Sequence, residues 1–549
     1  MKDNRCFLLL AAYFILVTYL YAQSSLDELY NSALKQFQDG NYKSAIELFD
    51  LVISTATKGG NKRDKGGEGG DKNILRKAYL TKADALSELL ELDSALKEYR
   101  RIIEKFPNTN ESLKAKLGIG LVYYKKNNYE TARAHFLNYI KKYPDTRITD
   151  DAQYWLGMLH FKNKNFRKAA VSFTALVQNY PKSNYAAEGW LRLGDCYYNL
   201  PLKKYKQARN SYRKVLTKYP DSPQAEFALY NIGRTYDSEG SVYDAISIYV
   251  QFVEKYPKSK LSPEITYRVA SYFYKKKKYE KAANYFEQIV INFPESELLE
   301  DASFMYSKTL YKQGAKTDAA NSFQKFIATY PLNKNNIEAI LYIGNYYLDS
   351  GDYQNAISNY EKGLMAEISD TEIIAMLRYN CALAYQKISD TITAEKYFAE
   401  ILYRYPKSLA AAKMYLQRGV DLERAGDYFA AIENYELAAT ISKNKNIQKN
   451  GSVDYGIEDD VGALAQKKAA DCFFIQKKYK EAAREYLKVV YLFNDSELVA
   501  ESHFMSARAS EEIGYVKEAK QNYEIVKKKY ANTEWAKKST ERLQEINKK

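Results

Sequence analysis

Side chains that commonly carry catalysis or bind metals are few in this sequence. Its three histidines, His135, His160 and His503, lie far apart, and no pair has the spacing of a metal-binding motif such as H-E-x-x-H. The sequence also has no G-x-S-x-G nucleophile motif, no P-loop and no dinucleotide-binding fingerprint. We therefore expect a protein that is not an enzyme, with no catalytic residues, no cofactor and no metal site.

The elements that would position any binding residues repeat along the chain. An alanine, which we call the marker, recurs thirteen times, mostly at intervals of 37 residues, with longer intervals of 50 and 51 after Ala45 and Ala431. A fixed period of about 20–50 residues is typical of a repeat array. The markers are Ala45, Ala95, Ala132, Ala169, Ala208, Ala245, Ala282, Ala319, Ala356, Ala394, Ala431, Ala482 and Ala519.

Two further positions recur with the marker. The residue four positions after it is always aromatic, and a small residue such as Gly120, Gly233 or Ala270 usually stands twelve positions before it. An alanine and an aromatic residue at i and i+4 share one face of a helix. Because glycine costs roughly 1 kcal/mol inside a helix, its recurrence indicates close packing of a first helix against this second one. A proline such as Pro294 then ends the second helix.

This pattern resembles the tetratricopeptide repeat family over about residues 26–531. The matching residues are the first-helix Gly–Tyr spacing (Gly120 and Tyr123, Gly233 and Tyr236, Gly344 and Tyr347), the marker alanines, the aromatic residues and the prolines. The resemblance implies an all-α fold, a right-handed superhelical solenoid of about thirteen helix-turn-helix repeats. The period of 37 and links such as LTKYPDS look like those of bacterial envelope proteins, namely the lipoprotein of the outer-membrane barrel-assembly machine and the accessory protein of the Tol–Pal system.

The remaining segments divide the chain. Residues 1–22 read as a signal peptide, because Lys2 and Arg5 precede a 17-residue apolar run; an uncleaved membrane anchor is the alternative. Cys6 precedes this run and is not placed for lipid attachment. We expect the first repeat at 23–55, a flexible Gly-rich charged loop at 56–73, repeats two to eleven at 74–442, a loop insertion at 443–460, repeats twelve and thirteen at 461–531, and a C-terminal capping helix at 532–549.

The other three cysteines, Cys196, Cys381 and Cys472, fall in first helices several repeats apart. The Cα atoms of a disulfide lie within about 7 Å, whereas packed helices are already about 8–10 Å apart. We therefore expect small buried apolar side chains and not a disulfide.

The candidate binding residues follow from the resemblance, which implies a groove formed by the first helices. Positions four and five after the packing residue should face this groove. Between repeats three and eight, all but repeat six place an aromatic residue at the first position, and four of these five follow it with a lysine. Rings offer contact area at low entropic cost, and lysines orient acidic or polar ligands. The alternative is that some rings pack against the next repeat. The candidates are Tyr124, Lys125, Phe161, Lys162, Tyr198, Tyr274, Lys275, Tyr311 and Lys312.

The sequence is thus typical of an exported, periplasmic scaffold that binds proteins or peptide segments in the bacterial cell envelope, in outer-membrane or peptidoglycan maintenance. An anchored form in the inner membrane is the alternative location. A binder of anionic glycan or lipid is the alternative function, because the net charge is +14 and the groove is basic and aromatic. Export argues against nucleic acid as a partner.

Overall fold

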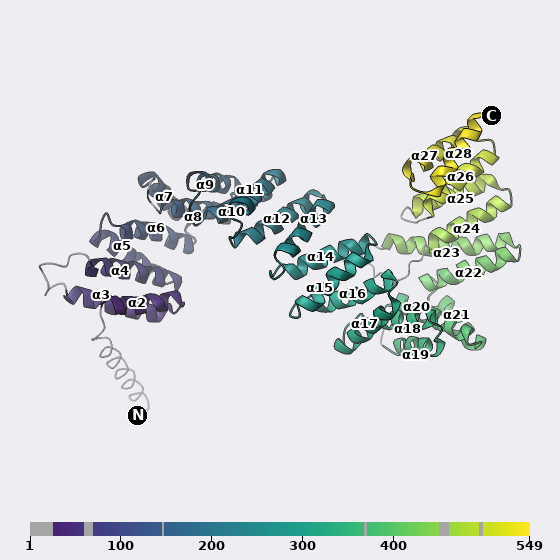
Figure 1. The fold of residues 1–549 in the computed structure, drawn as a ribbon, viewed down its shortest axis with the longest axis horizontal. Helices are drawn as coiled ribbons and strands as arrows, with labels where there is room; N and C mark the ends of the chain where they lie inside the picture. Colours follow the sequence, from purple (N-terminus) through teal and green to yellow (C-terminus); the bar gives the residue numbers. More distant parts are fainter. Residues whose placement is uncertain are drawn as a thin grey trace, which may run out of the picture. The chain divides into compact units, whose positions relative to one another are not determined.

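The computed structural model describes residues 26–59, 70–144, 146, 148–366, 370–448, 461–493 and 498–548. Within these ranges every regular element is an α-helix, and no strand is present. The chain divides into two compact units, Met1–Ser262 and Pro263–Lys549, which we call unit 1 and unit 2. In each unit consecutive helices pack as pairs, as the ribbons show (Figure 1).

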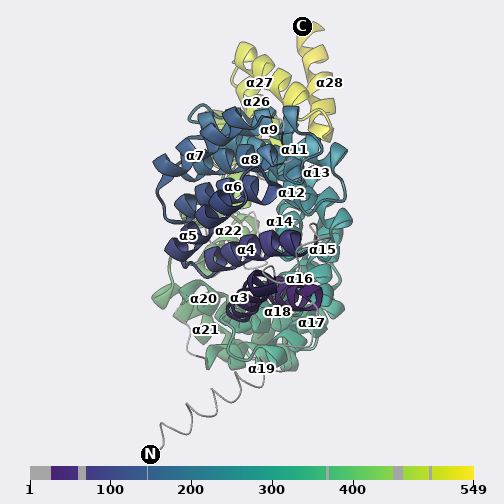
Figure 2. The same cartoon turned by 90° about the vertical axis from the view of Figure 1, so that its left-hand side faces the viewer.

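The described residues of unit 1 form six helix pairs, which are repeats one to six. A first helix packs on its second helix and then on the first helix of the next repeat, as α4, α5 and α6 show in the turned view (Figure 2). The helices are α2 (Leu26–Gln38), α3 (Tyr42–Gly59), α4 (Gly70–Glu88), α5 (Leu92–Lys105), α6 (Asn110–Lys125), α7 (Tyr129–Lys142), α8 (Thr149–Lys162), α9 (Phe166–Asn179), α10 (Ala186–Asn199), α11 (Tyr205–Lys218), α12 (Gln224–Glu239) and α13 (Val242–Lys255).

Unit 2 contains seven helix pairs, which are repeats seven to thirteen, and one further helix that covers the last pair. The helices are α14 (Ser262–Lys275), α15 (Tyr279–Asn292), α16 (Leu299–Gln313), α17 (Lys316–Thr329), α18 (Asn336–Asp349), α19 (Tyr353–Leu364), α20 (Thr371–Lys387), α21 (Thr391–Arg404), α22 (Leu409–Arg424), α23 (Tyr428–Gln448), α24 (Val461–Ile475), α25 (Tyr479–Leu492), α26 (Val499–Glu512), α27 (Val516–Lys529) and α28 (Glu534–Lys548).

Contact between the small residue and the aromatic ring builds each pair, as the spacing predicts. A Cβ atom added to Gly120 would lie 2.7 Å from a ring carbon of Phe136, and one added to Gly344 would lie 2.3 Å from Tyr360. Both distances are far below ordinary van der Waals separation, so only glycine allows these two helices to approach so closely. The markers are all buried, and so are the rings except Phe398, which is half-buried; together they form the core of the repeats.

The helix bounds differ in detail from the predicted segments. Helix α3 continues to Gly59 and α4 begins at Gly70, so both reach into the range assigned to a loop at 56–73, and α23 likewise reaches Gln448. The predicted signal peptide at 1–22 lies outside the described residues, as do most of the two loops. No helix in the described part of the chain is long and apolar enough to cross a bilayer. Helix α28 occupies the place predicted for a capping helix.

Candidate protein-binding surface

The predicted aromatic stripe lies at the C-terminal ends of first helices. Tyr124, Phe161 and Tyr198 belong to α6, α8 and α10 of unit 1, whereas Tyr274 and Tyr311 belong to α14 and α16 of unit 2. All five residues are half-buried, so each is partly accessible to solvent. The candidates therefore form two separate groups, one in each unit.

Within each repeat the ring packs against the start of the second helix. The ring centroids of Tyr124 and Tyr129 are 5.9 Å apart, and those of Phe161 and Phe166 are 5.4 Å apart. The same arrangement recurs between Tyr198 and Tyr205 (5.8 Å) and between Tyr274 and Tyr279 (5.5 Å). The covered side of each stripe residue thus stabilises the turn between the two helices, because tilted aromatic pairs at these separations attract one another.

Cations of the following repeat lie over these rings in unit 1. The Nζ atom of Lys162 is 5.0 Å from the centroid of Tyr124, the guanidinium of Arg192 is 5.8 Å from Phe161, and that of Arg234 is 5.2 Å from Tyr198. Such cation–π contacts are worth about 0.5–1 kcal/mol at exposed sites. The stripe in unit 1 is therefore a row of alternating rings and cations that crosses the repeat boundaries.

The predicted lysines also make polar contacts with the preceding repeat. Lys125 Nζ donates to the carbonyl oxygen of Ser87 at 3.0 Å and pairs with Glu88 at the same distance. Lys162 Nζ donates to Asn127 Oδ1 at 3.3 Å and remains exposed. Lys275 is also exposed, and Lys312 is half-buried. Part of the positive charge of Lys125 is thus compensated within the protein.

As Tyr124 packs against Trp155 at a centroid distance of 5.6 Å in unit 1, Tyr311 of unit 2 packs against the following repeat. Its ring meets Tyr342 of the next repeat at a centroid distance of 4.8 Å, edge to face. Burial raises the pKa of Tyr311 to about 12. Lys316, at the start of α17, lies 5.7 Å from its ring centroid. Tyr311 thus belongs partly to the packing between repeats, which was the alternative interpretation of the stripe.

A second recurring polar feature was not recognised in the sequence. In every repeat whose core ring is tyrosine, its hydroxyl donates to an acidic residue or asparagine one or four positions after the packing residue. No repeat with phenylalanine there has an acidic residue at either position. The donor–acceptor pairs are Tyr99–Asp84 (2.5 Å), Tyr212–Asp195 (2.8 Å), Tyr249–Asp237 (2.5 Å), Tyr360–Asn345 (2.8 Å), Tyr435–Glu423 (2.5 Å), Tyr486–Asp471 (2.6 Å) and Tyr523–Glu511 (3.1 Å).

These pairs explain why buried tyrosines are tolerated in the core. A buried hydroxyl without a partner costs about 1–3 kcal/mol, and a charged acceptor makes a stronger bond than a neutral one. Burial raises the pKa of Asp84 to about 6, although the hydrogen bond from Tyr99 acts in the opposite direction. The sequence does contain a signal for these pairs. Repeats with tyrosine four residues after the marker have an acidic residue or asparagine near the packing residue, and a comparison of the repeats would have revealed this.

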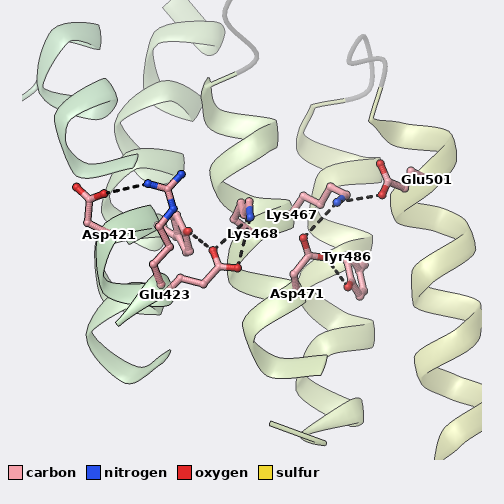
Figure 3. A network of polar contacts seen from close by, with 9 residues as sticks. Asp421, Glu423, Lys467, Lys468, Asp471, Tyr486 and Glu501 are labelled. Carbon is pink, nitrogen blue, oxygen red and sulfur yellow. Dashed lines mark hydrogen bonds and ion pairs between the residues drawn. The ribbon is translucent and has the colours of Figure 1, made fainter. Parts of the chain in front are cut away.

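First helices near the C-terminus carry a connected polar network (Figure 3). Lys468 of α24 pairs with Glu423 of α22 at 3.3 Å, and Lys467 pairs with Asp471 at 3.2 Å and with Glu501 of α26 at 3.0 Å. Burial alone would lower the pKa of Lys467, but its two carboxylate partners outweigh burial and raise it. These charges are paired across repeats eleven to thirteen.

The histidines and cysteines make no metal centre among the described residues, where no group of three or more His, Cys, Asp or Glu could hold a metal ion. Cys196, Cys381 and Cys472 are free and buried. Burial raises the pKa of the Cys381 and Cys472 thiols to about 12, so both remain protonated and unreactive at neutral pH.

Family comparisons agree with this architecture. Residues 75–200 match the YfiO family, described as an outer membrane lipoprotein. Tetratricopeptide repeat families match residues 188–222 and 227–259, residues 267–334, and residues 337–367. No curated protein matches the chain.

Solved structures of low sequence identity are similar to the chain in fold. The C-terminal part of a repeat protein from Cytophaga hutchinsonii is 19% identical, with a TM-score of 0.37, over 50% of this chain and 98% of that one. A Parabacteroides merdae tetratricopeptide repeat protein is 16% identical, with a TM-score of 0.28, over 49% and 99%. Yeast Tom70 is 13% identical, with a TM-score of 0.38, over 95% of both chains.

Thirteen helix pairs, the packing of small residue against ring, and the family matches together identify this chain as a tetratricopeptide repeat protein that resembles the outer-membrane lipoprotein type of bacterial envelope repeat protein.

Proposed function

We propose that this protein is an exported scaffold of the bacterial cell envelope, and that it holds partner proteins against the aromatic stripe of its first helices. The repeat architecture itself is that of a protein-interaction scaffold. The envelope assignment is supported by one observation, the match of residues 75–200 to an outer membrane lipoprotein family, and this range contains Tyr124, Phe161 and Tyr198.

The contacts of the stripe favour a polypeptide partner over an anionic polymer. Each aromatic residue of the stripe is partly accessible to solvent, whereas Lys125 already pairs with Glu88 and Lys162 lies over Tyr124. A ligand that depended on free lysine charge would have to compete with these contacts. An extended peptide can instead pack on ring edges and use the exposed lysines for orientation.

Site-specific crosslinking in cells tests this proposal. A photoreactive residue at position 162, which is exposed on the stripe, should crosslink to envelope proteins, whereas one at the exposed Lys168 position of α9 should not. Crosslinks from position 162 to cytoplasmic proteins alone would contradict the location. Crosslinks to lipid or glycan alone would instead support the basic-groove alternative.

Two further measurements test export and the site. Peptide mapping of the mature protein should place its N-terminus at Gln23. Replacing Tyr274 and Tyr311 by serine should weaken partner capture by about tenfold, or roughly 1.4 kcal/mol. Because Tyr311 also packs on Tyr342, the thermal unfolding of this variant must be measured beside the binding. Full-strength capture by a folded variant would exclude these two residues from the site.

A further inference from the structure

A cleft opens between repeats twelve and thirteen, on the side of the second helices. Its volume is about 470 Å³, and its walls are α25 on one side and the end of α26 with the start of α27 on the other. The apolar lining comes from Ala483, Leu487, Tyr491, Ile513 and Tyr515. A volume in this range is typical of sites that bind ligands.

One side chain that lines the cleft is smaller than its counterparts in the other repeats. The third residue after the packing position is aromatic, leucine or histidine in repeats two to twelve, but it is Ser510 in repeat thirteen. In repeats three and seven this side chain stacks on a ring of its own second helix: Tyr123 on His135 at 5.3 Å and Phe273 on Tyr285 at 5.8 Å. In repeat six, the ring of Tyr236 receives the guanidinium of Arg209 at 4.2 Å, and its hydroxyl accepts from Arg213 at 3.2 Å.

The corresponding positions around Ser510 are apolar. Ala483 and Leu487 of α25 stand where Arg209 and Arg213 stand in α11, one and five residues after the marker. Both line the cleft together with Ser510. Repeat thirteen therefore has an open slot at the place where another repeat inserts its own ring.

Tyr515 is a second departure from the pattern at the same cleft. It is the N-cap of α27, four residues before the marker, where the other twelve repeats have Asn, Asp, Glu, Lys, Ser or Ala. Like Lys278 and Ala315 at the same place, Tyr515 makes no side-chain cap bond, so its aromatic ring is what distinguishes it. Its ring is 51% exposed and that of Tyr491 is 73% exposed, so the cleft is rimmed by two solvent-facing tyrosines.

The charges around the cleft are uneven. Lys480, Arg484 and Lys488 stand one turn apart along the α25 wall, and Glu518 lies on the α27 wall. The buried Glu485 accepts from Arg484 at 3.0 Å and from Lys488 at 2.5 Å and so compensates one positive charge. The α25 rim is therefore net positive beside an apolar slot.

We propose that this cleft docks an acidic peptide segment of a partner protein, with one aromatic side chain of that segment inserted beside Ser510. The slot supplies the shape for the ring, Tyr491 and Tyr515 supply contact area, and the α25 rim attracts the acidic flanks. This site is separate from the aromatic stripe of the first helices and does not depend on the function proposed for it.

Fluorescence anisotropy with a defined probe tests the proposal. The probe is a labelled peptide of Glu and Asp residues around a central Trp, compared with the same peptide carrying Ala at the centre. The full-length mature chain should bind the Trp peptide at least about tenfold more tightly, and its affinity should fall as salt rises. Equal binding of both peptides, or binding of neither, would overturn the proposal.

The Ser510→Tyr variant supplies the decisive comparison, because it restores the side chain found in other repeats. We expect this variant to fold with unchanged or higher thermal stability and to lose the probe. If it does not fold, methyl NMR of the unmodified protein replaces it: the probe must shift Leu487 and Ile513 but not the distant Ile343. Unchanged binding to folded Ser510→Tyr, or shifts absent from the cleft, would refute the site.

A matched pair of charge reversals tests the α25 rim. Lys480→Glu should weaken binding of the Trp peptide several-fold. Lys43→Glu makes the same charge change at the same repeat position of α3 and should leave binding unchanged. Equal effects from both variants would indicate non-specific attraction to a cationic protein and would contradict docking at the cleft.

Discussion

The hydrogen bond between Tyr99 and Asp84 offers a sharp test of how the repeat cores are built. The hydroxyl of the buried Tyr99 donates to Asp84 Oδ1 at 2.5 Å. Tyr99→Phe removes the donor and leaves the ring in place. At pH 7.5 Asp84 is ionised, and loss of a hydrogen bond to a charged acceptor should cost about 1.5–3 kcal/mol.

The cost of Tyr99→Phe should depend on pH in a defined direction. Burial raises the folded-state pKa of Asp84 from 3.8 to about 6, so its ionisation destabilises the native state above about pH 6, and this loss is recovered as the pH falls. At pH 5 the carboxyl is mostly protonated in the folded state. The bond from Tyr99 is then neutral, and its removal should cost only about 0.5–1.5 kcal/mol.

Native-state hydrogen exchange of the α4 and α5 amides measures this locally, because the stability of a repeat array is a sum over repeats. Tyr256→Phe is the control, since the Tyr256 hydroxyl makes no hydrogen bond within the described structure, and its cost should be near zero. A Tyr99→Phe cost that matches the control, or that stays the same at pH 5 and pH 7.5, would refute the reasoning.

Three further changes test the packing. Gly344→Ala places a Cβ 2.3 Å from the Tyr360 ring, and this overpacking should destabilise the protein by about 1–3 kcal/mol. The better helix propensity of alanine should offset about 1 kcal/mol of this loss, and urea unfolding measures the net change. Lys308→Met removes the cation of the almost fully buried 2.9 Å ion pair with Glu338 and should cost about 3–5 kcal/mol of stability. A second, apolar replacement at Glu338 should restore most of that stability. Phe286→Ala should cost about 3–5 kcal/mol in α14 and α15 by hydrogen exchange.

Much of the fold could be predicted from the sequence because its main contact is made between residues at fixed positions in each repeat. Gly120 and Phe136 are sixteen residues apart and meet in space at the closest point of two helices, so their spacing specifies the pair. Packing within one repeat and onto the next then repeats the same geometry. The thirteen helix pairs follow from this one relationship.

The burial and the neighbours of the rings in the candidate stripe could not be predicted in the same way. The position of Tyr124 in its helix decides which side of the repeat its ring lies on. The cover over that ring comes from Trp155 and Lys162 of the following repeat, whose side chains vary from copy to copy. The turn between the two helices could not be predicted from residue type either. Lys277 adopts a φ of 56° at the position where Gly240 has a φ of 84°, although lysine disfavours positive φ, because the pairing of the helices fixes the turn.

Some departures from the repeat pattern are compensated by a neighbouring residue, and others mark a candidate binding surface. Lys308 directly follows the packing position, where ten of the other twelve repeats have apolar, Ser or acceptor residues and two have Arg234 and Arg508. Glu338 of the next repeat compensates its charge, because the two form a buried pair. Ser510 and Tyr515 depart from the pattern without such compensation: one leaves a slot unfilled, and the other exposes a ring where the other repeats have polar residues or alanine. Two uncompensated departures at one cleft are expected of a surface whose missing contacts are supplied by another molecule.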